Sequence, residues 1–235
     1  MKNCAIIYAE SDPGGDQTHL PMQFRPIAGL PLLAHTINAF ENSPAIDEII
    51  LVVDERYLLY VSEHVVDRNH FDKIHKIRVG GETRFQSVLS GLEGLSRDTD
   101  IVLIHDALRP FISGTDLDTL IDECLSHGAI AMGIPADMPV KRAEEGYILA
   151  SLDRNRIYLM QSPQAFRYSL IMDAYRNALS GTQAFADDAA VVEFYGHKVK
   201  VVDGDKSNIR IISERDFQVA KYLLEKPDRT EAGNV

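Results

Sequence analysis

The chain has 235 residues, and 45% of them are hydrophobic, which is enough to bury the core of one large α/β domain. The formal net charge of -11 argues against nonspecific binding to nucleic acid or to anionic membrane surfaces, because like charges repel. Cys4 and Cys124 lack both metal-ligand spacing and the density of a disulfide scaffold. No apolar run approaches the roughly 18 residues of a membrane span, so we expect a cytoplasmic protein.

Strand-like runs alternate with helical patterns along the chain. The runs are Cys4–Ala9, Glu48–Val53, Lys76–Val79, Ile101–Ile104, Ala129–Ile134 and Val199–Val202. A helical pattern that starts at Pro31 places Leu33, Ile37 and Phe40 on one face. The segment Leu117–Cys124 has the same spacing of apolar residues and predicts a second such helix. The alternation predicts a three-layer α/β fold with a mostly parallel sheet. We expect residues 1–235 to form one domain, with a disordered tail at 226–235.

Two glycines, Gly80 and Gly81, follow the strand that ends at Val79 and lead into a helix. Backbone amides exposed at a helix start attract an anion or the edge of a base. Arg84 and Ser87, three residues apart, lie on one face of this helix. The alternative is a tight strand-to-helix turn with a solvated arginine, because paired glycines are a weak signal by themselves.

The segment Ile101–Ile104 has the pattern of a central strand covered on both faces, and it runs directly into His105 and Asp106. Ligands of open α/β sheets bind outside the carboxyl ends of such strands, which suits Asp106 to a metal or a substrate hydroxyl. The alternative is that Asp106 only caps the following turn and pairs with Arg109.

The pattern of strands and helices breaks down between residues 135 and 156. Short polar and apolar pieces on either side of Glu144-Glu145-Gly146 predict a hairpin arm outside the main sheet. A connection of this length is usually functional or engaged with a partner, and a second subunit is the natural candidate.

Three polar segments follow the arm. In Gln161–Phe166 we expect a rigid proline turn that enters a helix. Asp187, Asp188 and Glu193 lie near the start of a helix, where capping alone would account for them. Gly204–Arg210 offers a cation, an acid and an amide in one loop, with a simple hairpin turn as the alternative. The sequence contains no Walker loop, Gly-x-Gly-x-x-Gly, Gly-x-Ser-x-Gly or paired-histidine motif. This argues against a P-loop protein, a dinucleotide-binding protein, a serine hydrolase of the nucleophile-elbow type and a zinc site.

Together, in order and spacing, these motifs resemble the family of 2-C-methyl-D-erythritol 4-phosphate cytidylyltransferases of the non-mevalonate isoprenoid pathway. The resemblance rests on six segments: Gly80–Val88, His105–Phe111, Asp153–Asn155, Ser162–Phe166, Asp187–Ala189 and Gly204–Ile209. It implies one nucleotidyltransferase domain with a Rossmann-like α/β/α sandwich and a β-arm at 135–156 that interlocks two subunits of a homodimer. It also implies a reaction in which CTP and a polyol phosphate give a CDP-polyol and pyrophosphate.

The resemblance also implies roles for single residues. The nucleotide would be bound by Ala9, Gly81, Arg84, Ser87, Asp106 and Ala107. The acceptor phosphate would be bound by Arg154, Arg109 and Lys141, with Arg154 reaching across the dimer. Asp106 would hold Mg²⁺ (or Mn²⁺), and Arg210, which stands where the family has a lysine, would act with Asp106 in catalysis.

The chain departs from the family pattern at two cations. Without a gap, the triphosphate arginine falls on Gly15 and the catalytic lysine on Met22. One alternative is therefore a family member that binds a nucleotide or a partner without turnover. Another is a different acceptor, such as ribitol 5-phosphate or a sugar phosphate, because Pro139 replaces the arm threonine that would touch the acceptor.

Overall fold

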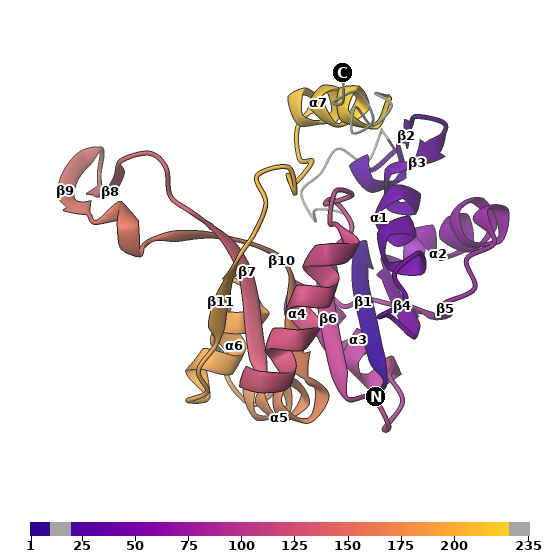
Figure 1. Ribbon diagram of the computed structural model, residues 1–235, viewed down its shortest axis with the longest axis horizontal. Helices are drawn as coiled ribbons and strands as arrows, with labels where there is room; N and C mark the ends of the chain where they lie inside the picture. Colours follow the sequence, from indigo (N-terminus) through magenta and orange to yellow (C-terminus); the bar gives the residue numbers. More distant parts are fainter. Residues whose placement is uncertain (10–19, 226–235) are drawn as a thin grey trace, which may run out of the picture.

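A seven-stranded sheet forms the centre of the protein (Figure 1). The computed structural model describes residues 1–9 and 20–225, so Gly15 and the tail expected at 226–235 lie outside the described residues. The strands are β1 (Asn3–Ala9), β4 (Glu48–Val53), β5 (Ile74–Val79), β6 (Ile101–Asp106), β7 (Ala129–Pro135), β10 (Tyr158–Arg167) and β11 (Lys200–Asp203). Their order is β11-β7-β10-β6-β1-β4-β5, and only β10 runs antiparallel to its neighbours. The mostly parallel sheet is confirmed.

Helices cover both faces of this sheet, as the three-layer prediction requires. One face carries α1 (Leu32–Glu41), α2 (Leu58–Val61) and α4 (Gly114–His127), and the other carries α3 (Arg84–Gly94), α5 (Tyr168–Ala178) and α6 (Asp188–Phe194). The shorter elements are η1 (Met22–Phe24), β2 (Pro26–Ile27), β3 (Leu30–Pro31), η2 (Glu55–Tyr57), the π-helical turn η3 (Ser62–Asp67) and η4 (Arg154–Arg156), and α7 (Glu214–Glu225) ends the described chain. Leu33, Ile37 and Phe40 are buried on one face of α1, as predicted.

The expectation of a proline turn entering a helix at 161–166 is wrong. These residues belong to β10, which lies between β6 and β7, and the helix begins only at Tyr168. The pairing of β10 with β7 shifts register between Met160 and Gln164. Pro163 lies within this irregularity, where its missing N–H breaks no regular ladder hydrogen bond.

The carboxyl ends of the parallel strands lie along one edge of the sheet. Ala9, the last residue of β1, is level with Val53 of β4, and Tyr8 is level with Asp106 of β6. All six residues of β6 are buried, as expected for a central strand. The candidate site residues at the ends of β1 and β6 and directly after β5 are therefore brought to the same edge.

The predicted arm is a two-stranded antiparallel hairpin of β8 (Val140–Glu144) and β9 (Tyr147–Leu152). It projects from the body of the protein, at the left of Figure 1. Several large apolar side chains of the arm and its flanks are exposed: Met138, Tyr147, Ile148, Leu149, Leu152, Tyr158 and Leu159. Within the described ranges, no helix is both long and apolar enough to cross a membrane.

Close packing of α3 against the sheet predicts the effect of a single methyl group. A Cβ atom at Gly91 would lie 2.7 Å from Cγ2 of Ile6 and 3.1 Å from Cγ2 of Val52. We expect Gly91→Ala to lower the free energy of unfolding by about 1–2 kcal/mol, because overpacking outweighs the gain in helix propensity. Urea denaturation measures the difference.

Gly114→Ala is the matched control, since nothing lies within 4 Å of a Cβ atom built at that first residue of α4. It should change stability by no more than about 0.5 kcal/mol. Equal stabilities for the two variants would show that α3 does not pack this closely.

Candidate nucleotide and phosphate site

The carboxylate of Asp106 is buried at the end of β6 and accepts two hydrogen bonds. Its Oδ1 accepts from the Leu108 amide at 2.9 Å, and its Oδ2 accepts from Nε of Arg210 at 2.5 Å. The first part of the alternative, that Asp106 caps the next turn, is thus correct. The cation that pairs with Asp106, however, is Arg210 rather than Arg109.

The loop of residues 204–210 lies against the ends of β6 and β10. Nη1 of Arg109 donates to the Asn208 carbonyl at 2.6 Å, and Nδ2 of Asn208 donates to the Ser162 carbonyl at 2.9 Å. Gln161 donates from Nε2 to the Asp205 carbonyl at 2.8 Å. The loop leads from β11 to α7 and not to a second strand, so the hairpin alternative is wrong. It holds Arg109 and Arg210 beside Asp106. Burial lowers the pKa of Arg109.

His105 links the segment that carries Arg109 to β10 through a directed chain of hydrogen bonds. The Asp106 amide donates to Oγ of Ser162 at 3.0 Å, and Oγ lies 3.2 Å from Nδ1 of His105. Nε2 of His105 lies 2.9 Å from the Arg109 carbonyl, which can only accept. The neutral Nε2–H tautomer satisfies every member of the chain. Burial lowers the pKa of His105 to about 4.

The backbone amides of residues 80–83, which follow β5, are hydrogen-bonded within the chain, so these four amides are not free to bind an anion. Gly80 donates to the Val53 carbonyl at 2.9 Å, and Gly81 donates to Oγ of Ser87 at 2.9 Å. The next two amides donate to Oε1 of Gln86 at 2.8 and 3.2 Å. Ser87 is fully buried and braces this turn. Roles for Gly81 and Ser87 in binding the nucleotide stay predictions.

Arg84 is not solvated but ion-paired to Asp188, whose side chain is 1% exposed. Its two Nη atoms donate to the two carboxylate oxygens at 3.0 and 2.5 Å, and its guanidinium lies 4.8 Å from the centre of the Tyr8 ring. Burial by itself lowers the pKa of Arg84, but the charge and hydrogen bonds of Asp188, together with Tyr8 and Tyr175, outweigh burial and raise the pKa. Asp187 is the N-cap of α6, so capping accounts for Asp187 and not for Asp188.

Two small residues end strands at the same edge of the sheet. The carbonyl of Ala9 accepts from Nε2 of Gln23 at 3.1 Å. The amide of Ala107 donates to the Tyr8 carbonyl at 3.1 Å, and its carbonyl accepts from Oγ1 of Thr36 at 2.7 Å. Both alanines are buried, and they fix the backbone on either side of Tyr8 and Asp106.

Met22, at the position of the expected lysine, lies in η1 and packs against the buried apolar cluster that contains Ile27 and Ile211. A neighbouring arginine, Arg25, has its Nη1 3.7 Å from Sδ of Met22. That arginine forms a bidentate pair with Glu214 of α7 at 2.7 and 3.3 Å. The charge nearby is thus held in an ion pair with α7.

The predicted acceptor-binding residues of the arm stand apart from Asp106. Nζ of Lys141 donates to Oγ of Ser151 across the hairpin at 2.5 Å. Nη1 of Arg154 donates to the Asp137 carbonyl at 2.9 Å, and Nζ of Lys206 pairs with the Asp137 carboxylate at 2.5 Å. The structure therefore brings Arg109, Arg210 and Asp106 together but leaves the arm cations at a separate place.

Asp106 is the carboxylate to which the sequence analysis assigned a metal. In the part of the chain that the structure describes, no three His, Cys, Asp or Glu side chains form a group that could hold an ion. Mg²⁺ in nucleotide enzymes usually takes one or two carboxylates, with phosphates and water as its other ligands. A single carboxylate beside arginines fits an ion that arrives with a nucleotide.

Three site features escaped the sequence analysis: Tyr8 under Arg84, the Ser162 hydroxyl, and the pairing role of Asp188. Tyr8 is the penultimate residue of a predicted strand, and its position at the carboxyl end was the available signal. Ser162 and Asp188 carry no signal of this kind, because their partners are 56 and 104 residues away in sequence.

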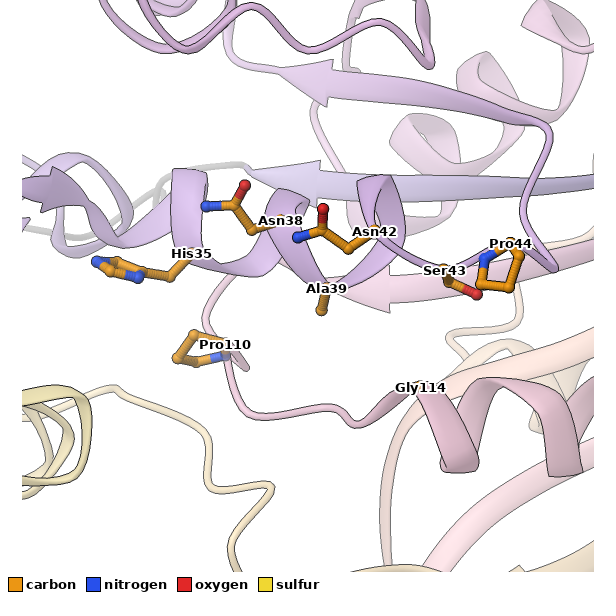
Figure 2. Close-up of a pocket in the computed structure, with 8 residues that line it drawn as sticks. All are labelled: His35, Asn38, Ala39, Asn42, Ser43, Pro44, Pro110 and Gly114. Atoms are coloured by element: carbon orange, nitrogen blue, oxygen red, sulfur yellow. The ribbon is translucent and has the colours of Figure 1, made fainter. Parts of the chain in front are cut away.

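A separate hollow of about 370 Å³ lies between α1 and the loop that leads into α4, as Figure 2 shows. It is lined by His35, Asn38, Ala39, Asn42, Ser43, Pro44, Pro110 and Gly114. None of the predicted site residues is among them.

The buried His105 makes stability depend on pH. Its ordinary pKa of 6.5 applies to the unfolded chain, which therefore binds more protons than the folded chain between pH 6.5 and about 4. The contribution is fully present above pH 6.5 and falls as the pH is lowered through this window, by about 3 kcal/mol in total.

We expect His105→Gln, which cannot titrate, to lose this part of the pH dependence. Urea denaturation at pH 7 and at pH 4.5, with EDTA present, measures it for both proteins. If the variant and the wild type lose equal stability on acidification, His105 is not held neutral by burial.

Comparisons with known proteins identify the family of the chain. The sequence profile of the 2-C-methyl-D-erythritol 4-phosphate cytidylyltransferase family matches residues 4–226. The chain is 36% identical to proteins of that name from Clostridium novyi and Pelotomaculum thermopropionicum, over 95% of its length and 97% and 95% of theirs. The crystal structure of 4-diphosphocytidyl-2C-methyl-D-erythritol synthase from Anaerococcus prevotii superposes with a TM-score of 0.84 at 29% identity, covering 96% of each chain. The chain therefore belongs to the 2-C-methyl-D-erythritol 4-phosphate cytidylyltransferase family.

Proposed function

We propose that this chain is itself a cytidylyltransferase, which joins the cytidylyl group of CTP to 2-C-methyl-D-erythritol 4-phosphate and releases pyrophosphate. The relatives described above are named for this reaction. The observation that carries the proposal is the buried Asp106 at the end of a central strand, with Arg109 and Arg210 held beside it. Tyr8, level with Asp106, carries the guanidinium of Arg84 on its ring.

In this reaction an oxygen of the acceptor phosphate attacks the α-phosphorus of CTP in line. The new P–O bond forms as the bond to the bridging oxygen breaks, and pyrophosphate leaves with that oxygen. Such catalysis is mostly positioning and charge neutralisation. Arg109 and Arg210 supply the positive charge, while the Asn208 carbonyl and the Asp106 carboxylate hold their guanidinium groups in place.

The proposed cofactor is Mg²⁺ (or Mn²⁺), held by Asp106 together with the phosphates of the nucleotide. When bound, it would neutralise phosphate charge and align the triphosphate. Asp106 already accepts from Arg210, so the arginine and a bound ion would both draw on this carboxylate. The side chain of this arginine is half-exposed.

The proposed partner of the arm is a second copy of this chain. Tyr147 is 77% exposed and Ile148 67% exposed, although apolar surface of this kind is normally covered. In a homodimer the arm would cover this surface and carry Arg154 and Lys141 toward the acceptor of the neighbouring subunit. We place the reaction in the cytoplasm, where the free thiols of Cys4 and Cys124 stay reduced.

Removing the charges at the end of β6 should abolish most of the activity. We expect Asp106→Asn and Arg210→Gln each to lower kcat by about a hundredfold or more, because each removes a charged group beside the reacting phosphates. Pyrophosphate release from CTP and 2-C-methyl-D-erythritol 4-phosphate with Mg²⁺ measures kcat. Asp118→Asn, on the exposed face of α4, is the control and should leave kcat unchanged.

Turnover by the wild type with this acceptor supports the proposal. A wild type that binds CTP but releases no pyrophosphate with this acceptor would contradict it. Activity restricted to ribitol 5-phosphate would keep the reaction type and replace the acceptor.

A charge on the arm should break the dimer. We expect Ile148→Asp to convert a species of twice 26.2 kDa into a monomer, because the substitution buries a carboxylate in an apolar contact. Light scattering after gel filtration gives the mass. Leu59→Asp, at a residue of α2 that is also highly exposed, should leave the mass unchanged. A monomeric wild type, or a dimeric Ile148→Asp protein, would exclude the arm as the interface.

A further inference from the structure

Asp188 is a nearly inaccessible acid for which capping gives no reason. Its side chain is 1% exposed, and an uncompensated carboxylate at that depth would strongly destabilise the fold. The carboxylate accepts from both Nη atoms of Arg84 and from the hydroxyl of Tyr175, at 3.0, 2.5 and 2.6 Å. Three hydrogen bonds, two of them from a cation, keep it paired.

The position of Asp188 is itself fixed by the sheet. Gln164 of β10 accepts from the Ala189 amide through Oε1 at 2.8 Å and donates through Nε2 to Asp187 at 2.9 Å. This two-point contact docks the start of α6 on β10 and places Asp188 opposite Arg84. The ring of Tyr175 stacks on Phe85 at 4.5 Å between centroids, which fixes the hydroxyl.

Arg84 is the exposed end of this arrangement. Its side chain is 32% exposed, although its partner is buried. A guanidinium carries five N–H donors, and the Asp188 carboxylate takes two of them, so donors remain for a ligand. The guanidinium also lies over the ring of Tyr8, 4.8 Å from its centre, which further limits its movement. The group is thus held with its orientation set and with part of its donor surface open.

We propose that Asp188 is the positioning residue that presents Arg84 to the nucleoside end of CTP. The proposal rests on the function proposed above, in which Arg84 contacts the nucleotide. Without the carboxylate, the guanidinium would lose both of its anchoring bonds, and binding would have to supply the cost of ordering it. Tyr175 assists by orienting the carboxylate, and neither residue touches the nucleotide.

The test compares two ligands that share only one end of the site. Isothermal titration with CTP and with inorganic pyrophosphate, both with Mg²⁺, gives Kd for each. We expect Asp188→Asn to raise Kd for CTP by about tenfold or more, since charge-assisted hydrogen bonds are lost. Kd for pyrophosphate should change less than about twofold, because the phosphates bind near Asp106 and Arg210.

Glu193→Gln is the matched control, since this exposed acid lies on the same helix, α6, and takes no part in the contacts that hold Arg84. It should leave both Kd values unchanged. The double variant Arg84→Gln/Asp188→Asn should bind CTP no more weakly than Arg84→Gln alone, because Asp188 acts only through Arg84.

Tyr175→Phe keeps the stacked ring and removes only the hydroxyl, so it serves if Asp188→Asn does not fold. We expect it to weaken CTP binding about threefold or more, with pyrophosphate binding unchanged.

An unchanged Kd for CTP in a folded Asp188→Asn protein would overturn the proposal. So would a parallel loss of CTP and pyrophosphate binding, or additive effects in the double variant. If Asp188→Asn does not fold, an unchanged Kd for CTP in Tyr175→Phe overturns the proposal. Turnover is measured separately, so a wild type that binds CTP through Arg84 without pyrophosphate release would refute the proposed function and leave this inference standing.

Discussion

The site depends on one contact between strands of opposite direction, the hydrogen bond from the Asp106 amide to Oγ of Ser162. It ties the end of parallel β6 to antiparallel β10 at the irregularity where β10 shifts its register with β7. His105 extends the link to the Arg109 carbonyl, and Asn208 extends it to the loop that carries Arg210. Because these groups share partners, the positions of the acid and both arginines are set together.

A second set of contacts orients the opposite end of the site through the same strand. Gln164 of β10 docks α6, and α6 supplies the buried carboxylate that holds Arg84 over Tyr8. The strand that inserts between β6 and β7 therefore positions both the charged centre near Asp106 and the candidate nucleoside contact. Met22 stands outside these contacts, packed among apolar side chains beside an arginine that is paired with α7.

The sequence analysis succeeded where the signal is local. The apolar run before Asp106 identified a buried central strand, and the short polar and apolar pieces at 135–156 identified the arm, because both patterns follow from the immediate neighbours of each residue. It failed at β10, where Pro163 suggested a turn, because the role of this strand is defined by β6 and β7 and not by its own composition. It also failed at Asp188, whose partner Arg84 is distant in sequence and near only after folding.

Direct observation of the product by phosphorus NMR tests the central claim, that this arrangement carries out cytidylyl transfer. The wild-type protein is incubated with CTP, 2-C-methyl-D-erythritol 4-phosphate and Mg²⁺. The account predicts that the triphosphate signals decline while the signals of a diphosphate diester and of pyrophosphate appear in equal amounts. Triphosphate signals that persist unchanged, with CTP bound to the protein and the acceptor present, would contradict it.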